Sequence, residues 1–220
     1  MSVSACITSV SGPILLPEER AFLREAQPWG LILMGRSCET AVQVQALTSE
    51  IKSELGRDAL IFIDQEGGRV ARLKPPQWPK FPAAGVYGDL YNHQPEAARE
   101  ACFLGHRLMG QMLYELGIYA DCAPCCDLRQ AETHDAIGDR AFGYSVDAVT
   151  DLTEAAIKGL RDAGVSAVVK HMPGQGRSTL DTHYDLPRVG ADATTLLEDL
   201  SIFKALSDQV LMGMTCHVIF

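Results

Sequence analysis

The 220-residue sequence lacks a surplus of positive charge, a long apolar run and a recognisable secretory leader. Its net charge is −9 and no stretch concentrates Lys and Arg, which argues against nucleic acid or an anionic membrane as partner, because phosphates attract a basic surface. No apolar run reaches the length that crosses a bilayer. The opening stretch, MSVSACITSVSG, has neither a charged n-region nor an apolar h-region. We therefore expect a soluble, intracellular protein.

The seven cysteines are an odd number, which is typical of free thiols in a reducing compartment. Cys122 and Cys125 have the C-x-x-C spacing of a metal knuckle, and Cys126 adjoins them. A structural zinc site needs four ligands, and no second Cys or His pair at zinc spacing accompanies these three. We favour the alternative that they pack as small apolar side chains near a strand end.

Short apolar runs alternate with helix-like periodicity along the chain. The periodicity predicts helices after Pro17 and over residues 44–55, 101–116, 149–163 and 196–203, with Leu108 and Leu200 on apolar faces. A polar, proline-rich loop is predicted over residues 64–94. The apolar runs predict six strands, at residues 6–10, 30–34, 59–63, 118–122, 165–169 and 209–216.

Strands that are apolar throughout and alternate with helices predict a parallel sheet covered by helices. A doubly wound nucleotide-binding sheet is disfavoured, because no glycine-rich fingerprint follows the first strand. A (β/α)8 TIM-type barrel carries its functional residues after several strands, and Arg36, Asp64, Asp127, Lys170 and His217 all follow predicted strands. We predict an α/β fold in which residues 1–220 form a single, partial barrel domain. It would hold about six of the eight β/α units and leave the first and sixth strands as unpaired edges.

Lys170 and His171 directly follow the apolar run VSAVV. Lys170 would act as a Schiff-base nucleophile if its neighbours lowered its pKa. It would otherwise donate to substrate hydroxyls, or form an ion pair with a carboxylate at another strand end. The residues alone leave these three interpretations open.

Asp181 and His183 lie two residues apart in the loop that follows Gly174 and Gly176. In extended backbone two such side chains point the same way, and a carboxylate beside an imidazole fixes its tautomer. His183 would then be a general acid or base near neutral pH, carried by a mobile loop. The alternative is a surface histidine next to an aspartate that caps a turn.

Asp64 ends the third predicted strand, and Arg72 lies eight residues further on. A carboxylate and a guanidinium together can hold a polyol, because one accepts and the other donates hydrogen bonds. Glu66 is a rival acid, and a buried ion pair between Asp64 and Arg72 is the structural alternative. Arg140 lies after the fourth strand, and the adjacent Asp139 is expected to hold it in place.

Several of these stretches resemble the glycoside hydrolases of family 3, and in particular their bacterial β-N-acetylglucosaminidase branch. The most specific piece is KHMPGQGRSTLDTH, because other branches of that family do not carry the histidine at its end. The other pieces occur in the family's order and span nearly the whole chain: GLILMGR, IDQEGGRVARL, DCAPCCDL, IGDRAFG and GMTCHVIF.

This resemblance implies a barrel that removes terminal β-linked N-acetylglucosamine with retention, from cell-wall fragments in the bacterial cytoplasm. His183 would be the acid/base catalyst, oriented by Asp181. The sugar pocket would be lined by Asp64, Arg72, Arg140, Lys170 and His171. No metal, organic cofactor or macromolecular partner is expected, and the protein is expected to be a monomer.

The resemblance also places the nucleophilic aspartate of the family after a seventh strand, beyond residue 220. We therefore expect this 220-residue form to hydrolyse its substrate weakly or not at all. Three alternatives remain: a Schiff-base lyase or aldolase that uses Lys170, a partial barrel that binds sugar without cleaving it, and a different family 3 activity such as that of a β-glucosidase.

Overall fold

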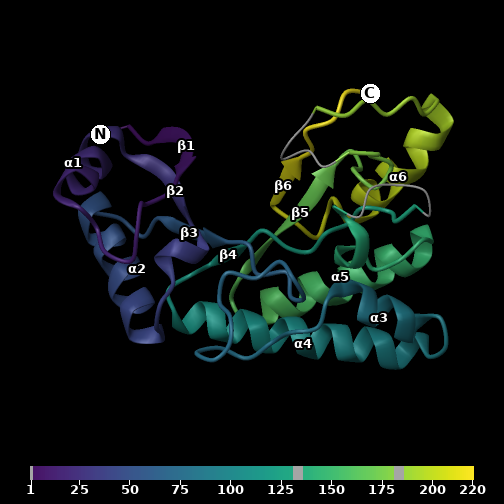
Figure 1. Ribbon diagram of the computed structural model, residues 1–220, viewed down its shortest axis with the longest axis horizontal. Coiled ribbons are helices and arrows are strands. Elements are labelled where there is room, and N and C mark those ends of the chain that lie inside the picture. Colours follow the sequence, from purple (N-terminus) through teal and green to yellow (C-terminus); the bar gives the residue numbers. More distant parts are fainter. Residues whose placement is uncertain (1, 131–135, 181–185) are drawn as a thin grey trace.

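Six parallel strands form one sheet in the order of the chain, as the computed structural model shows (Figure 1). The structure describes residues 2–130, 136–180 and 186–220. The strands are β1 (Ser4–Thr8), β2 (Pro28–Leu33), β3 (Leu60–Ile63), β4 (Ala120–Asp121), β5 (Ser166–Met172) and β6 (Met212–Thr215). The helices are α1 (Pro17–Ala26), α2 (Ala41–Leu55), α3 (Ala84–Tyr91), α4 (Pro95–Glu115), α5 (Val146–Asp162) and α6 (Ala193–Leu206).

The sheet curves from β1 at the N-terminal side to β6 at the C-terminal side, with α3, α4 and α5 along its outer side (Figure 1). Every neighbouring pair of strands is parallel. Within the described residues, β1 and β6 each pair with a single strand, so they are the two edges of an incompletely closed barrel. This arrangement confirms the predicted α/β fold with six strands and its two sheet edges.

Local sequence signals fix the ends of the helices. Thr40 caps α2 by accepting a hydrogen bond from the backbone of Gln43, and Ser145 caps α5 by accepting one from Ala148. Gly56 ends α2 in the left-handed conformation, with a φ of 63° that residues other than glycine adopt at a cost. The predicted apolar faces of α2 and α5 are buried, as expected.

The two faces of β3 have different neighbours, and this decides where the functional side chains lie. Ile61 and Ile63 join the large core between the sheet and its helices. Phe62 instead packs with Ala120 and Val168 in a smaller cluster inside the curve of the sheet. Side chains alternate between the faces of a strand, so residues two places beyond Phe62 and Val168 also face the interior. Those residues are Asp64 and Lys170.

Three of the predictions about helices are wrong. Residues 64–94 are not wholly a loop, because they contain α3. Leu108 on α4 is 62% exposed and Leu200 on α6 is 39% exposed, so neither lies on the buried face. Helix α4 packs closely against the end of α5 through the small residue Gly110, where an added Cβ would lie 2.8 Å from the Cβ of Ala163. The buried face of α4 therefore includes Gly110 and not Leu108. In α6 the buried residues are Asp199, Ile202, Phe203 and Leu206. The carboxylate of Asp199 accepts a hydrogen bond from Arg177 at 2.5 Å.

Among the described residues, no helix is both long enough and apolar enough to span a bilayer.

Candidate active site

A cavity of about 460 Å³ opens where β3, β5 and β6 end. Its walls combine charged side chains from loops after β3 and β4 with the ends of β5 and β6. The lining residues are Asp64, Glu66, Val70, Arg72, Arg140, Lys170, His171, Gln175, Met214, Thr215, Cys216 and His217.

Lys170 lies in the wall of this cavity, on the interior face of β5. Its side chain is only 2% exposed. The ammonium Nζ donates to Asp64 Oδ1 at 3.0 Å and lies 2.5 Å from Glu66 Oε1. Lys170 therefore joins two carboxylates that both come from the loop after β3.

Two guanidinium groups complete the charged cluster. Arg140 binds Glu66 through two parallel hydrogen bonds, of 2.8 Å from Nε and 2.7 Å from Nη2. Arg72 donates from Nη2 to Asp64 Oδ2 at 2.9 Å. Such charge-assisted bonds are short, and the bidentate pair also fixes orientation. Three cations face two anions in this cluster, so it carries a net positive charge.

The charges of the cluster hold each other in the ionised form. Burial alone would raise the pKa of Asp64, but Lys170 and Arg72 outweigh it and the pKa lies below its ordinary value. Burial opposes ionisation of Glu66 as well, and Arg140 with Lys170 again lowers the pKa. Burial would lower the pKa of Lys170, yet Glu66 and Asp64 raise it above the ordinary value. Lys170 is therefore a fixed cation in this structure.

Gln65 holds the loop after β3 in position. Its backbone N–H donates to Asp121 Oδ1 at 2.9 Å, and its side-chain oxygen accepts from the backbone of Arg72 and Leu73 at 2.9 and 3.0 Å. Asp121 is fully buried on β4, and this burial raises its pKa well above the ordinary value, which favours the uncharged carboxylic acid. The backbone that carries Asp64, Glu66 and Arg72 is thus tied to the neighbouring strand.

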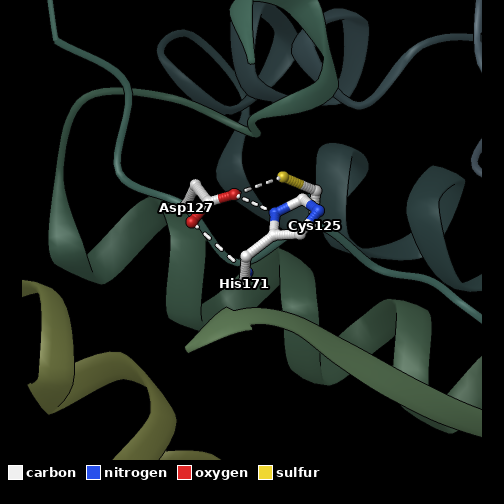
Figure 2. Close-up of side chains that lie close together, drawn as sticks. All are labelled: Cys125, Asp127 and His171. Atoms are coloured by element: carbon white, nitrogen blue, oxygen red, sulfur yellow. Dashed lines mark hydrogen bonds and ion pairs between the residues drawn. The ribbon is translucent and has the colours of Figure 1, made fainter. Parts of the chain in front are cut away.

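Asp127 orients His171 at the rim of the cavity (Figure 2). Its Oδ2 lies 2.7 Å from His171 Nδ1 and accepts from the Cys125 thiol at 3.1 Å. Its Oδ1 accepts from the backbone N–H groups of Gln175 at 2.6 Å and His171 at 3.3 Å. Burial opposes the charge on Asp127, but His171 and these hydrogen bonds outweigh it and lower the pKa. The carboxylate therefore stays ionised and fixes the imidazole.

The structure brings together the five residues predicted to line a sugar pocket: Asp64, Arg72, Arg140, Lys170 and His171. They come from three separate loops or strand ends, so their convergence is a property of the fold. Asp181 and His183 lie outside the described residues, and their predicted roles remain predictions.

Two expectations about single residues are wrong. Arg140 is not held by Asp139, because Asp139 binds Arg69 at 2.9 Å and Glu66 binds Arg140 instead. Arg36 follows β2 but does not line the cavity; it donates to the backbone oxygen of Val10 and to Ser9. Gln175 contributes to the site although it was not predicted to be a functional residue. Asp127 was predicted only as a polar residue after the fourth strand, and it contributes by orienting His171. The position of Asp127 directly after DCAPCC was the available signal.

The cysteines of the DCAPCCDL stretch are all buried. Cys122 packs against Phe62 and Val168, which agrees with the apolar role predicted for it. Cys125 differs, because its thiol donates to Asp127 Oδ2 at 3.1 Å and lies near His171. These three residues are a cluster in the described part of the chain whose side-chain atoms could hold a metal ion, since the ligating atoms all lie within 4.8 Å of one another.

The fold and the site together define a barrel-type α/β protein with a polar, charge-lined cavity at the carboxyl ends of its strands. The family description of the glycosyl hydrolase family 3 N-terminal domain matches residues 14–220. The beta-hexosaminidase of Alkalilimnicola ehrlichii is 37% identical over 223 residues, which cover 100% of this chain and 63% of that protein.

Two solved structures are also similar. NagZ from Neisseria gonorrhoeae, in complex with N-trifluoroacetyl-D-glucosamine, has a TM-score of 0.93 at 30% identity and covers 99% of this chain and 64% of that chain. A family 3 β-N-acetylglucosaminidase from Paenibacillus sp. has a TM-score of 0.90 at 30% identity, covering 98% of this chain and 41% of that chain. The protein belongs to glycosyl hydrolase family 3. The chain spans about three fifths of the length of the curated beta-hexosaminidases it matches.

Proposed function

We propose that this chain is the sugar-binding part of a retaining β-N-acetylhexosaminidase that releases terminal β-linked N-acetylglucosamine. One observation carries the proposal: the cluster of Lys170, Asp64, Glu66, Arg72 and Arg140 lines an open cavity with fixed donors and acceptors. A pyranose offers a ring of hydroxyl groups that both donate and accept, which such a cluster can bind in one orientation. The names of the relatives agree with this substrate class.

The described residues have distinct tasks in this proposal. Asp64 accepts from sugar hydroxyls with its partly exposed carboxylate, while Arg72 and Lys170 hold that carboxylate in place and donate where their remaining N–H groups face the cavity. His171 presents its ring to the same cavity, oriented by Asp127. Because these groups are positioned before the sugar arrives, binding costs little reorganisation.

Hydrolysis needs two further groups. We assign the general acid and base to His183, oriented by Asp181, on the loop that follows β5. In a retaining enzyme a nucleophile about 5 Å from the acid/base group attacks the anomeric carbon, and the sugar is then released by water. We assign this nucleophile to a carboxylate beyond residue 220 and therefore expect this form to be weakly active or inactive.

The natural substrate that we propose is a peptidoglycan fragment, processed in the cytoplasm by a monomeric protein. The net charge of −9 supports a neutral or small glycan partner over nucleic acid or an anionic membrane surface. No cofactor is part of the proposed reaction.

A Schiff-base lyase that uses Lys170 is the first alternative function. An amine nucleophile needs a lowered pKa, whereas Asp64 and Glu66 raise that of Lys170. The geometry therefore favours the glycosidase. Borohydride reduction in the presence of sugar aldehydes tests this point: a mass increase on Lys170 supports the lyase, and an unmodified Lys170 supports the glycosidase.

The second alternative is a barrel that binds sugar without cleaving it. Turnover of a chromogenic N-acetylglucosaminide should be compared between this chain and a longer version that carries the following two β/α units. Hydrolysis by the longer version alone is the expected result. Equal turnover by both forms would refute the placement of the nucleophile, and binding without turnover in both would favour the non-catalytic barrel.

The sugar pocket itself is tested with Asp64→Asn and the matched control Asp162→Asn. Both changes remove a carboxylate that is paired with a lysine, but Asp162 pairs with Lys158 on the outer surface of α5. Loss of a charge-assisted hydrogen bond costs about 1.5–3 kcal/mol, so Asp64→Asn should weaken N-acetylglucosamine binding by roughly tenfold or more. Calorimetric titration measures the dissociation constant for N-acetylglucosamine. Equal affinities of the two variants would contradict the assignment of Asp64 to the sugar pocket.

A further inference from the structure

The loop after β3 also lines a second cavity of about 460 Å³. Glu66 and Arg72 of this loop line the cavity that we assign to the sugar. Their neighbours in sequence, Gln65, Ala71 and Leu73, line the second cavity instead. Successive side chains of extended backbone point to opposite sides, so the two cavities lie on opposite sides of this loop. In the part of the chain that the structure describes, they share no lining residue.

The second cavity is basic in a chain that is acidic as a whole. None of its described lining residues is Asp or Glu, although the chain carries a net charge of −9. Residues 67–83, which form most of its wall, contain Arg and Lys side chains and no carboxylate. We call this cavity the basic pocket and define it by the lining residues Gln65, Leu73, Lys74, Pro79, Lys80 and Phe81.

Two lysines at the rim of the basic pocket are available to a ligand. Arg69, which also lines the pocket, pairs with Asp139 at 2.9 Å. Lys74 and Lys80 form no ion pair with any residue in the ranges 2–130, 136–180 and 186–220, and both are exposed. An anion between these two ammonium groups would accept charge-assisted hydrogen bonds, which are stronger than neutral ones.

Gln65 adds a buried polar group to the wall of the basic pocket. Its side chain is only 1% exposed, and its Nε2 donates to the backbone oxygen of Leu73 at 3.1 Å. A primary amide has two N–H donors. The second donor of Gln65 has no partner among the described residues. An oxygen atom of a ligand would satisfy it, which a purely apolar ligand could not do.

We propose that the basic pocket binds a small organic acid, that is, a carboxylate on an apolar or aromatic body. The carboxylate lies between the ammonium groups of Lys74 and Lys80. The body packs against Leu73, Pro79 and Phe81, which are the apolar part of the wall. Inorganic phosphate would use the same cations but leave this apolar surface uncovered. The site goes beyond the proposed hydrolase function and does not depend on it.

Titration with 4-fluorobenzoate tests the ligand class, with fluorine NMR as the measurement and a buffer free of carboxylates. We expect saturable binding at about one equivalent. The neutral analogue 4-fluorobenzamide has the same shape, and acetate has the charge without the body. Each should bind at least about tenfold more weakly than 4-fluorobenzoate. Saturating N-acetylglucosamine should not displace 4-fluorobenzoate, because the two cavities have different walls.

Substitution of the rim lysines tests the location of the site. Lys74→Gln and Lys80→Gln should each weaken 4-fluorobenzoate binding by at least about fivefold. The matched control Lys204→Gln removes an exposed lysine from α6 and should leave the affinity unchanged. All three lysines are exposed, so the variants should keep the fold, and far-ultraviolet circular dichroism checks this.

The proposal is overturned if 4-fluorobenzoate shows no saturable binding, or if 4-fluorobenzamide or acetate binds as tightly. Rim-lysine variants that bind as tightly as Lys204→Gln would overturn it as well. Displacement by N-acetylglucosamine would place the anion in the sugar cavity and has the same consequence. If N-acetylglucosamine itself does not bind, the proposed function fails, and the two lysine variants still decide whether the basic pocket takes an organic acid.

Discussion

Replacing Lys170 with methionine tests the central electrostatic feature of the site. Lys170→Met keeps the apolar stem but removes the buried cation that joins Asp64 and Glu66. Removing one partner of a buried ion pair typically costs about 3–5 kcal/mol. Each carboxylate retains one arginine here, since Arg72 still binds Asp64 and Arg140 still binds Glu66. We therefore expect the lower end, about 3 kcal/mol at pH 7.

Urea unfolding followed by tryptophan fluorescence measures this loss, with Lys158→Met as the matched control. Lys158 is 56% exposed and pairs with Asp162 one helical turn away, so its loss should cost no more than about 0.5 kcal/mol. The folded-state pKa values of Asp64 and Glu66 are lowered, so their stabilisation is present above the ordinary carboxylate range and is lost as pH falls. The difference between Lys170→Met and the unmodified chain should accordingly shrink below about pH 4. Equal losses in the two variants at pH 7 would refute the reasoning.

Three further outcomes follow from single positions. Burial lowers the pKa of His106 to about 4, so as the pH falls the imidazole is protonated in the unfolded chain before it is protonated in the folded chain. The free energy of unfolding should therefore fall by on the order of 3 kcal/mol from pH 6.5 to pH 4. His106→Gln should reduce this pH dependence in urea titrations, and an equal pH dependence in the variant would contradict the assignment. A Cβ on Gly88 would lie 1.5 Å from the backbone oxygen of Phe142, whereas a Cβ on Gly143 would meet nothing within 4 Å. Gly88→Ala should therefore lower the melting temperature by more than about 8 °C, and the control Gly143→Ala by less than about 3 °C. Similar shifts in the two variants would refute the close packing of α3. Ile202→Ala should lower the free energy of unfolding by about 2–4 kcal/mol, and Leu200→Ala by under about 1 kcal/mol, because Ile202 is buried and Leu200 is partly exposed. Urea unfolding measures both, and a larger loss for Leu200→Ala would support the helix face predicted from the sequence.

The strands and their order could be predicted because continuous apolar runs separated by helical periodicity leave few topologies open. The faces of α4 and α6 could not, because the periodicity does not reveal which helix packs closest. The buried face of α4 follows from its contact with α5 through Gly110, a residue with no hydrophobic signal of its own. Asp199 occupies a buried position on α6 because Arg177, distant in sequence, supplies its partner. A hydrophobicity pattern does not reveal that a charged residue can be buried when a residue elsewhere in the chain neutralises it.

Part of the candidate site could be predicted because, in a barrel of parallel strands, the polar residues that follow the strands all lie at the same end of the barrel. That rule was sufficient to select Asp64, Lys170 and His171. Arg72 and Arg140 were candidates because they lie in the stretches that follow the third and fourth strands, and the resemblance then implied that all five line a sugar pocket. The pairing within the site was not predictable, because it depends on side-chain reach across the sheet. Asp139 is the nearest acid to Arg140 along the chain, yet Glu66, which is 74 positions away, forms the bidentate contact.

The strictly sequential strand order has a bearing on synthesis at the ribosome. Each newly emerged β/α unit can dock on the one before it, so assembly can proceed from the N-terminus without waiting for distant sequence. The ionic pairing is the exception, because Asp64 meets Lys170 across a separation of 106 residues. A nascent chain that ends before β5 carries Asp64 and Glu66 with Arg72 and Arg140 but without Lys170, so each carboxylate lacks one of its two cations until that strand arrives. Closure of the interior is thereby coupled to the late arrival of a single cation.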